Sequence, residues 1–109
     1  MHLLELMRDA QTVILIDAVK TGEPIGTLHR FQNDEIAAVT TSLSTHGLGV
    51  AEAMQMGEIL HLLPPHVILY GIEINDVQMQ FMRSKPIEQA IETLVIRLES
   101  TILSICSLL

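Results

Sequence analysis

Asp17 has a carboxylate that can bind a metal ion, and it lies near the predicted end of a strand, where such side chains often bind ligands. It follows five apolar or β-branched residues (12–16), so we expect its carboxylate near the carboxyl end of a buried strand. In open α/β sheets, ligands bind at that end of the strands. The alternative interpretation is that Asp17 only accepts a hydrogen bond from a nearby helix or loop N–H.

His46 is the second candidate ligand, in a glycine-containing stretch (42–50) that leads into a predicted helix. A helix N-terminus carries partial positive charge, which disfavours imidazolium and keeps the ring neutral, as a metal ligand must be. The alternative is a loop histidine bonded to a hydroxyl group or to water. If Asp17 and His46 share a crevice, they form half of a site for a borderline divalent ion such as nickel or zinc.

Other reactive side chains are expected to have lesser roles. Glu73 ends a second buried run and could face the same crevice, with a hydrogen-bonded supporting role or plain solvation as the expected outcome. His29, in the short edge-like strand, is expected to form a surface pair with a carboxylate, and Cys106 is expected to be buried and inert. His61 and His66 flank a turn and are expected to be solvated. The sequence contains no nucleophile elbow, phosphate loop or paired-cysteine zinc motif, so the catalytic residue stays unassigned.

The elements that must position these residues follow an α/β order. Continuous β-branched runs over 12–19 and 66–74 predict strands that are buried on both faces of a parallel sheet. Residues 27–31 predict a short edge strand, and 33–45 predict a loop. Helices are predicted at 3–10, at 48–63 and from 84 to the end, the last with a core stripe of Ile87, Ile91, Leu94, Leu98 and Ile105. One flank of this thin sheet lacks a neighbouring strand.

Composition narrows the class of partner. A single domain spanning 1–109 is expected, and a net charge of −7 argues against nucleic acid and anionic membranes as partners. The sequence shows neither a signal peptide nor an uninterrupted apolar membrane span, so a cytoplasmic protein is expected. Hydrophobic residues make up 49% of the chain, more than a small domain buries easily, and this favours a covered surface.

Four sequence blocks resemble the hydrogenase maturation protease family in order and spacing: Ile14–Val19, Gly26–Phe31, Ser44–Ala53 and Tyr70–Glu73. The resemblance implies a three-layer α/β sandwich with a twisted, mostly parallel sheet. It also implies an endopeptidase that removes the C-terminal extension of the nickel–iron hydrogenase large subunit after nickel insertion. Such enzymes recognise the nickel through a Glu, an Asp and a His. By motif position, Asp17 matches the Asp and His46 matches the His.

The chain departs from the family at its start. The family opens with a strand, a Gly-Asn turn and a helix that carries the acidic ligand, all upstream of the position that corresponds to Leu3. We therefore expect a fold that is incomplete at its N-terminal side, with Glu73 as only a speculative substitute for the ligand. An open sheet edge and the apolar helix 87–109 then predict an obligate homo-oligomer.

Two functions follow from the resemblance. The first is the maturation endopeptidase, whose partner is the large-subunit precursor and whose nickel is supplied by that substrate, with zinc or cadmium as substitutes. The second is a non-catalytic remnant that serves as an oligomeric binding or assembly module of the same family. The missing ligand favours the second function, whereas the presence of Asp17 and His46 in their motif contexts favours the first.

Overall fold

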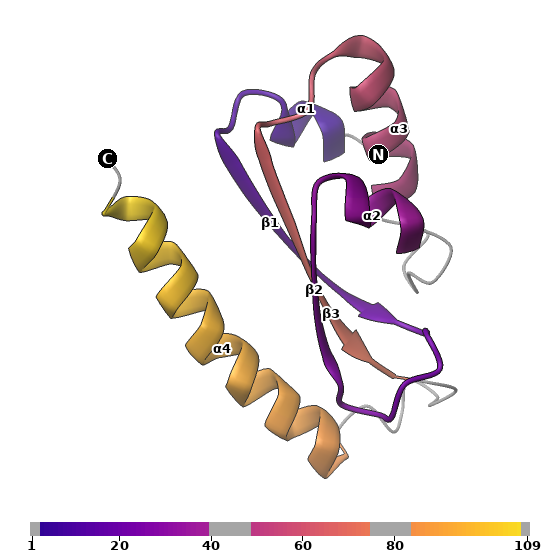
Figure 1. The fold of residues 1–109 in the computed structure, drawn as a ribbon, viewed down its shortest axis with the longest axis vertical. Coiled ribbons are helices and arrows are strands. Elements are labelled where there is room, and N and C mark those ends of the chain that lie inside the picture. The colour runs from indigo at the N-terminus through magenta and orange to yellow at the C-terminus, as the bar shows by residue number, and fades with distance from the viewer. Residues whose placement is uncertain (1–2, 40–48, 75–83, 108–109) are drawn as a thin grey trace.

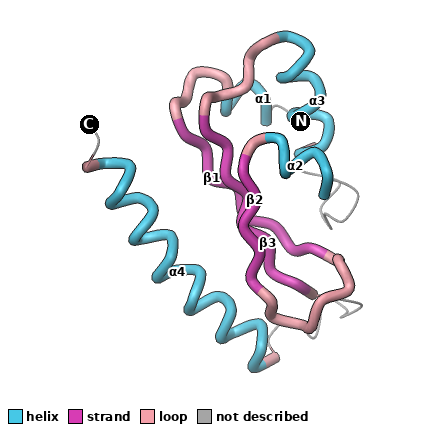
Figure 2. The backbone as a smooth tube through the Cα atoms, in the orientation of Figure 1, coloured by secondary structure: helices cyan, strands magenta, loops and turns pink. Residues whose placement is uncertain are grey.

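The computed structural model describes residues 3–39, 49–74 and 84–107. The described residues form helices on both faces of a twisted sheet, which confirms the predicted α/β layered class (Figures 1 and 2). The elements in chain order are α1 (Leu3–Met7), β1 (Thr12–Val19), β2 (Leu28–Gln32), α2 (Asp34–Val39), α3 (Val50–Leu60), β3 (His66–Glu73) and α4 (Lys85–Cys106).

The described strands form one sheet in the order β1-β3-β2. β1 runs parallel to β3, from the pair Thr12↔His66 to the pair Val19↔Glu73, as their continuous apolar runs predict. β2 pairs antiparallel with the other side of β3 and is the predicted edge strand. β1 occupies the opposite edge of the described sheet, and Ile16 on this strand is 49% exposed. The prediction that this strand is buried on both faces was wrong, because β1 is an edge strand of the described sheet and only Asp17 and Val19 on it are buried.

Each face of the sheet carries its own hydrophobic core. α1, α2 and α3 cover one face, and α4 covers the other (Figure 1). Fully burying one large aliphatic side chain contributes about 1.5–3 kcal/mol, so both layers stabilise the sheet. The first core contains Met7, Val19, Ile36, Val50, Ala53, Met54, Val67 and Leu69, and the second contains Ile68, Tyr70 and Leu94.

α2 corrects the loop that the sequence predicted over 33–45. A tertiary contact creates this short helix: Asn33 Oδ1 accepts a hydrogen bond from the backbone N of Val67 at 2.9 Å, and the Asn33 N donates to the Val67 O at 2.9 Å. The Asn33 O then accepts from the Ile36 N at 3.0 Å, and the Ile36 side chain is fully buried. Six residues are too few for a clear helical period, which is why the polar sequence looked like a loop. Residues 40–45 lie outside the described part.

The C-terminal helix is present, but two predictions about its side chains were wrong. Ile87 and Leu94 are buried as expected, whereas Ile91 is 47% exposed. At 3.6 residues per turn Ile91 lies about 60° around the helix from Leu94, at the margin of the stripe that faces the sheet. Cys106 was expected to be buried, but it is exposed in the last turn. The described helices include none that is both long and apolar enough to cross a membrane.

Gly26 fixes the approach of the β1–β2 loop to the start of α4. Its φ is +87°, and an added Cβ would lie 2.6 Å from the backbone O of Pro86. We expect Gly26→Ala to lower the free energy of unfolding by about 2–4 kcal/mol, because it adds left-handed backbone strain and a backbone clash. Urea unfolding measures this change.

Gly22 offers a matched control in the same loop. It has φ +93°, but an added Cβ would meet nothing within 4 Å. Gly22→Ala is therefore expected to cost only the backbone strain, about 1–2 kcal/mol. Equal losses for the two variants would show that the Pro86 contact does not matter.

Candidate functional site

The carboxyl ends of the parallel strands bring three chemically capable side chains to one face of the sheet. Asp17 on β1 and His29 on β2 both pair with Gly71 of β3, from opposite sides. Glu73 follows two residues after Gly71 and therefore points to the same face. Helices α1, α2 and α3 cover this face of the sheet. The carboxyl ends of the strands are where open α/β sheets bind ligands.

Asp17 has a buried carboxylate, and among the described residues only one of its two oxygens has a hydrogen-bond partner. The residue is 7% exposed, and its Oδ1 accepts a hydrogen bond from the Ala18 N at 2.8 Å. Its Oδ2 is buried and has no hydrogen-bond partner among the described residues. An unsatisfied buried polar atom costs about 1–3 kcal/mol, so such atoms are few in native proteins, and a catalytic role or a bound ion is one explanation for them. A carboxylate oxygen is acceptor-only, so the group that fits it is a donor or a cation.

The predicted meeting of Asp17 with His46 stays a prediction, because His46 lies outside the described residues. Within the part of the chain that the structure describes, no group of three or more His, Cys, Asp or Glu side chains is arranged to hold a metal ion. Among the described residues, Asp17 is thus a single candidate ligand and not part of a completed metal centre.

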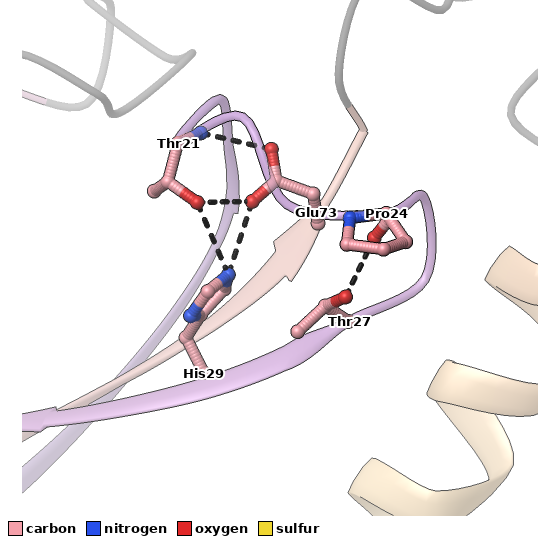
Figure 3. Close-up of polar contacts among 5 residues, drawn as sticks. All are labelled: Thr21, Pro24, Thr27, His29 and Glu73. Carbon is pink, nitrogen blue, oxygen red and sulfur yellow. Dashed lines mark hydrogen bonds and ion pairs between the residues drawn. The ribbon is translucent and has the colours of Figure 1, made fainter.

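Glu73 is fully buried and its carboxylate is engaged on both oxygens (Figure 3). Oε2 accepts from the Thr21 backbone N at 2.8 Å, and Oε1 accepts from the Thr21 hydroxyl at 2.5 Å and contacts His29 Nε2 at 3.0 Å. Burial raises the pKa of Glu73, but the hydrogen bonds from Thr21 and the contact with His29 bring it below its ordinary value. Solvation of Glu73 is therefore excluded, and its occupied oxygens argue against direct metal ligation.

The cluster of Thr21, His29 and Glu73 is not a nucleophilic triad. One nitrogen of His29, Nε2, lies 3.0 Å from Glu73 Oε1 and 3.5 Å from Thr21 Oγ1. In a Ser-His-Asp type of site the acid and the nucleophile use different ring nitrogens. Here the Thr21 hydroxyl donates to Glu73 instead. The expected pairing of His29 with a carboxylate is confirmed, although the partner is buried rather than at the surface.

The same cluster ties the β1–β2 loop to the end of β3. The backbone adds to the tie, because the Gly26 N donates to the Glu73 O at 2.8 Å and the Glu73 N donates to the Thr27 O at 2.9 Å. Thr27 Oγ1 in turn donates to the Pro24 O at 2.6 Å (Figure 3). Thr21 was not identified from the sequence. The sequence showed only that Thr21 carries a hydroxyl group shortly after the first predicted parallel strand, and that Glu73 ends the second.

His61 and His66 are exposed, as the turn pattern predicts. His61 caps the C-terminus of α3 with φ 57° and is exposed. His66 begins β3 and is also exposed. Neither lies near the carboxyl end of the parallel strands.

Comparisons with known proteins agree on one family. The family model described as "Hydrogenase maturation protease" (HycI) matches residues 1–101. The hydrogenase expression/formation protein HupD of Thiocapsa roseopersicina is 30% identical over 74 residues, which cover 66% of this chain and 34% of that protein. The protein of the same name from Bradyrhizobium diazoefficiens is 26% identical over 80 residues, which cover 72% of this chain and 42% of that protein. The chain thus matches less than half the length of these relatives.

Solved structures show the same fold. The hydrogenase maturating endopeptidase HybD from E. coli superposes with a TM-score of 0.65 at 22% identity, over 92% of this chain and 65% of that one. The solution structure of an endopeptidase from Escherichia coli gives a TM-score of 0.68 at 23% identity, over 93% of this chain and 66% of that one. Because the family model spans nearly the whole sequence, this chain belongs to the hydrogenase maturation protease family.

Proposed function

We propose that this chain acts as an endopeptidase that removes the C-terminal extension of the nickel–iron hydrogenase large subunit after nickel insertion. One observation supports the proposal: the buried carboxylate of Asp17 has an oxygen without a hydrogen-bond partner among the described residues, at the ligand-binding end of the strands in a member of this family. Substrate recognition through a metal gives that oxygen a partner only when the correct substrate is present.

The nickel in this proposal belongs to the substrate. Asp17 and His46 would contact it, since carboxylate oxygen and neutral imidazole are ligands that nickel accepts. Zinc or cadmium could take its place for the same reason. Glu73 lies on the same face as Asp17 and holds the β1–β2 loop, which supports a positioning role behind the ligands.

The test is incubation of the full chain with purified large-subunit precursor, either loaded with nickel or free of it. Mass spectrometry of the precursor detects removal of the tail. We expect the loaded precursor to lose its tail and the nickel-free precursor to keep it. An intact loaded precursor would contradict the proposed activity.

A second candidate function is a non-catalytic module that binds the same precursor. It is favoured by Glu73, the speculative substitute for the missing acidic ligand, whose two carboxylate oxygens are already engaged by Thr21 and His29. Co-purification of chain and precursor, with the tail retained, would support this candidate over the first.

We also propose that copies of the chain associate through the β1 edge and an apolar stripe on α4. Ile91, Val95 and Ile102 on this stripe are 47%, 48% and 49% exposed. The opposite flank of α4, at Pro86 and Ala90, faces the β2 side, so the stripe faces the side of β1. An aliphatic edge strand beside an apolar helix can pair with its own copy about a two-fold axis.

Charge placed in this stripe is expected to disrupt the association. Val95→Lys should shift the mass measured by light scattering toward the monomer at micromolar concentration, because each copy would have to bury a charge. Ile96→Lys is the control, since Ile96 is 68% exposed and lies about 100° further around the helix, away from the sheet. A wild-type chain that is already monomeric would refute the proposal.

A further inference from the structure

A groove on the other face of the sheet from Asp17 lies between the strands and the C-terminal half of α4 (Figure 1). Arg30 pairs with Tyr70 and Gln32 pairs with Ile68, so these side chains share the face that α4 covers. The groove has a volume of about 500 Å³, a size typical of sites for small molecules. None of the described residues that line it is acidic, although the chain has 13 Asp and Glu.

The groove is elongated and has an aliphatic floor. Ile68 of β3 is 4% exposed and lines the groove together with Ile105 of α4. His66, the first residue of β3, lines one end, and Arg30 lines the groove opposite Tyr70, four residues further along that strand. At ~3.3 Å per residue, these two positions are about 13 Å apart. The shape therefore suits an extended apolar chain that has one end beside Arg30.

Arg30 gives the groove a positive charge that no acidic side chain balances. Its guanidinium carbon lies 6.0 Å from the centre of the buried Tyr70 ring. The attraction between a cation and the face of an aromatic ring holds the charge at the groove. Arg30 has no ion pair with a carboxylate among the described residues. In a chain of net charge −7, this guanidinium favours a ligand whose end beside Arg30 is an anion.

We propose that this groove binds a medium-chain aliphatic carboxylate, with the carboxylate on Arg30 and the chain along Ile68 and Ile105. A planar guanidinium binds the two oxygens of a carboxylate in a matching geometry, and one cation balances one negative charge. The hydroxyl groups of Ser100 and Ser104 also line the groove, but they can bond to carbonyl groups of their own helix and do not require a polar ligand. The site is independent of the proposed metal contact and goes beyond the proposed cleavage reaction.

The test is an NMR titration of the full ¹⁵N-labelled chain with octanoate, which should shift the amide resonances of Arg30, Ile68 and Thr101. Octanamide has the same chain without the charge, and butyrate has the same charge on a shorter chain. Each should bind at least about tenfold more weakly than octanoate. No binding of octanoate, or an equal affinity for either of the other two, would overturn the proposal. Tighter binding of octyl phosphate than of octanoate would overturn the choice of a carboxylate.

Two variants test where the ligand binds. Arg30→Gln should weaken octanoate at least about tenfold and leave octanamide unchanged, because it removes the charge alone. Ser104→Phe fills the groove from an exposed helix position and should weaken both ligands. Arg8→Gln is the control, at an exposed arginine beside Asp9, and should bind octanoate as the wild type does. Wild-type affinity for octanoate in both groove variants would refute the site.

Tyr70 offers an independent measurement, because it is the one tyrosine of the chain and the chain has no tryptophan. Its hydroxyl is bonded to Thr101 Oγ1 at 3.0 Å, and Thr101 lines the groove. A carboxylate beside Arg30 adds a negative charge near this hydroxyl, so octanoate should raise the pKa of Tyr70 in an absorbance titration, whereas octanamide should not. The same pKa with and without bound octanoate would contradict the placement of the carboxylate.

Discussion

Asp17→Asn is expected to slow nickel-dependent tail removal at least 100-fold while changing the free energy of unfolding by less than about 1 kcal/mol. The rate falls because the amide gives up the charge that the proposed metal contact needs. Stability stays close to wild type because Oδ2 has no described partner to lose. The amide oxygen of Asn can still accept the bond from the Ala18 N. Single-turnover cleavage of loaded precursor and urea unfolding measure the two quantities.

This combination distinguishes a ligand from a structural residue. Asp9→Asn is the matched control, because the Asp9 side chain is 94% exposed in the turn before β1, and it should leave both quantities unchanged. His46→Ala should reproduce the loss of rate if His46 shares the metal contact. Cleavage at the wild-type rate by Asp17→Asn would remove Asp17 from the mechanism and with it the main support for the proposed function.

Glu73→Ala is expected to produce the largest loss of stability, about 2–4 kcal/mol. The substitution removes the acceptor for the Thr21 N, the Thr21 hydroxyl and His29 from a fully buried position. Such a loss is a large share of the ~5–15 kcal/mol that a typical domain has. Urea unfolding at pH 7 measures it. The neutral isostere Glu73→Gln keeps part of the acceptor capacity and should lose less. An effect below about 1 kcal/mol for Glu73→Ala would show that the cluster does not hold the loop.

The same residue predicts how stability depends on acidity. The pKa of Glu73 is lowered on folding from its ordinary value of 4.5, because the hydrogen bonds and His29 outweigh the effect of burial. Its contribution is therefore complete above pH 4.5 and is lost as the pH falls through the lowered value. The difference in unfolding free energy between wild type and Glu73→Gln should shrink as the pH drops below about 4.5. A difference that grows with acidity would contradict the sign of this shift.

The sequence predicted the bounds of β1 and β3 to within one residue, because their β-branched residues favour a strand over a helix. The runs that became β1 and β3 are β-branched and apolar without alternation, which is typical of strands in layered α/β sheets. Helix α4 was equally clear from its proline at the start and its apolar period. The sequence did not show how many of the apolar residues of α4 are buried against the sheet. Whether Ile91 is covered depends on how wide a surface the sheet presents, and that is a property of the packed structure.

The short helix α2 could not be predicted from the sequence, because it depends on a contact with a residue far away along the chain. Asn33 is fixed by the backbone of Val67, a residue 34 positions later in the chain. Local propensity over six residues is weak, and the tertiary contact decides the conformation.

By itself, the sequence determined the family, the α/β class and the choice of Asp17 as a candidate ligand, since each rests on local composition or on a motif in order along the chain. Only the tertiary structure decided that Glu73 is a buried anchor instead of a solvated acid or a free ligand. Its partners Thr21 and His29 lie 52 and 44 positions away in the chain. Strand pairing sets which of these groups meet, and burial sets how strongly their hydrogen bonds count.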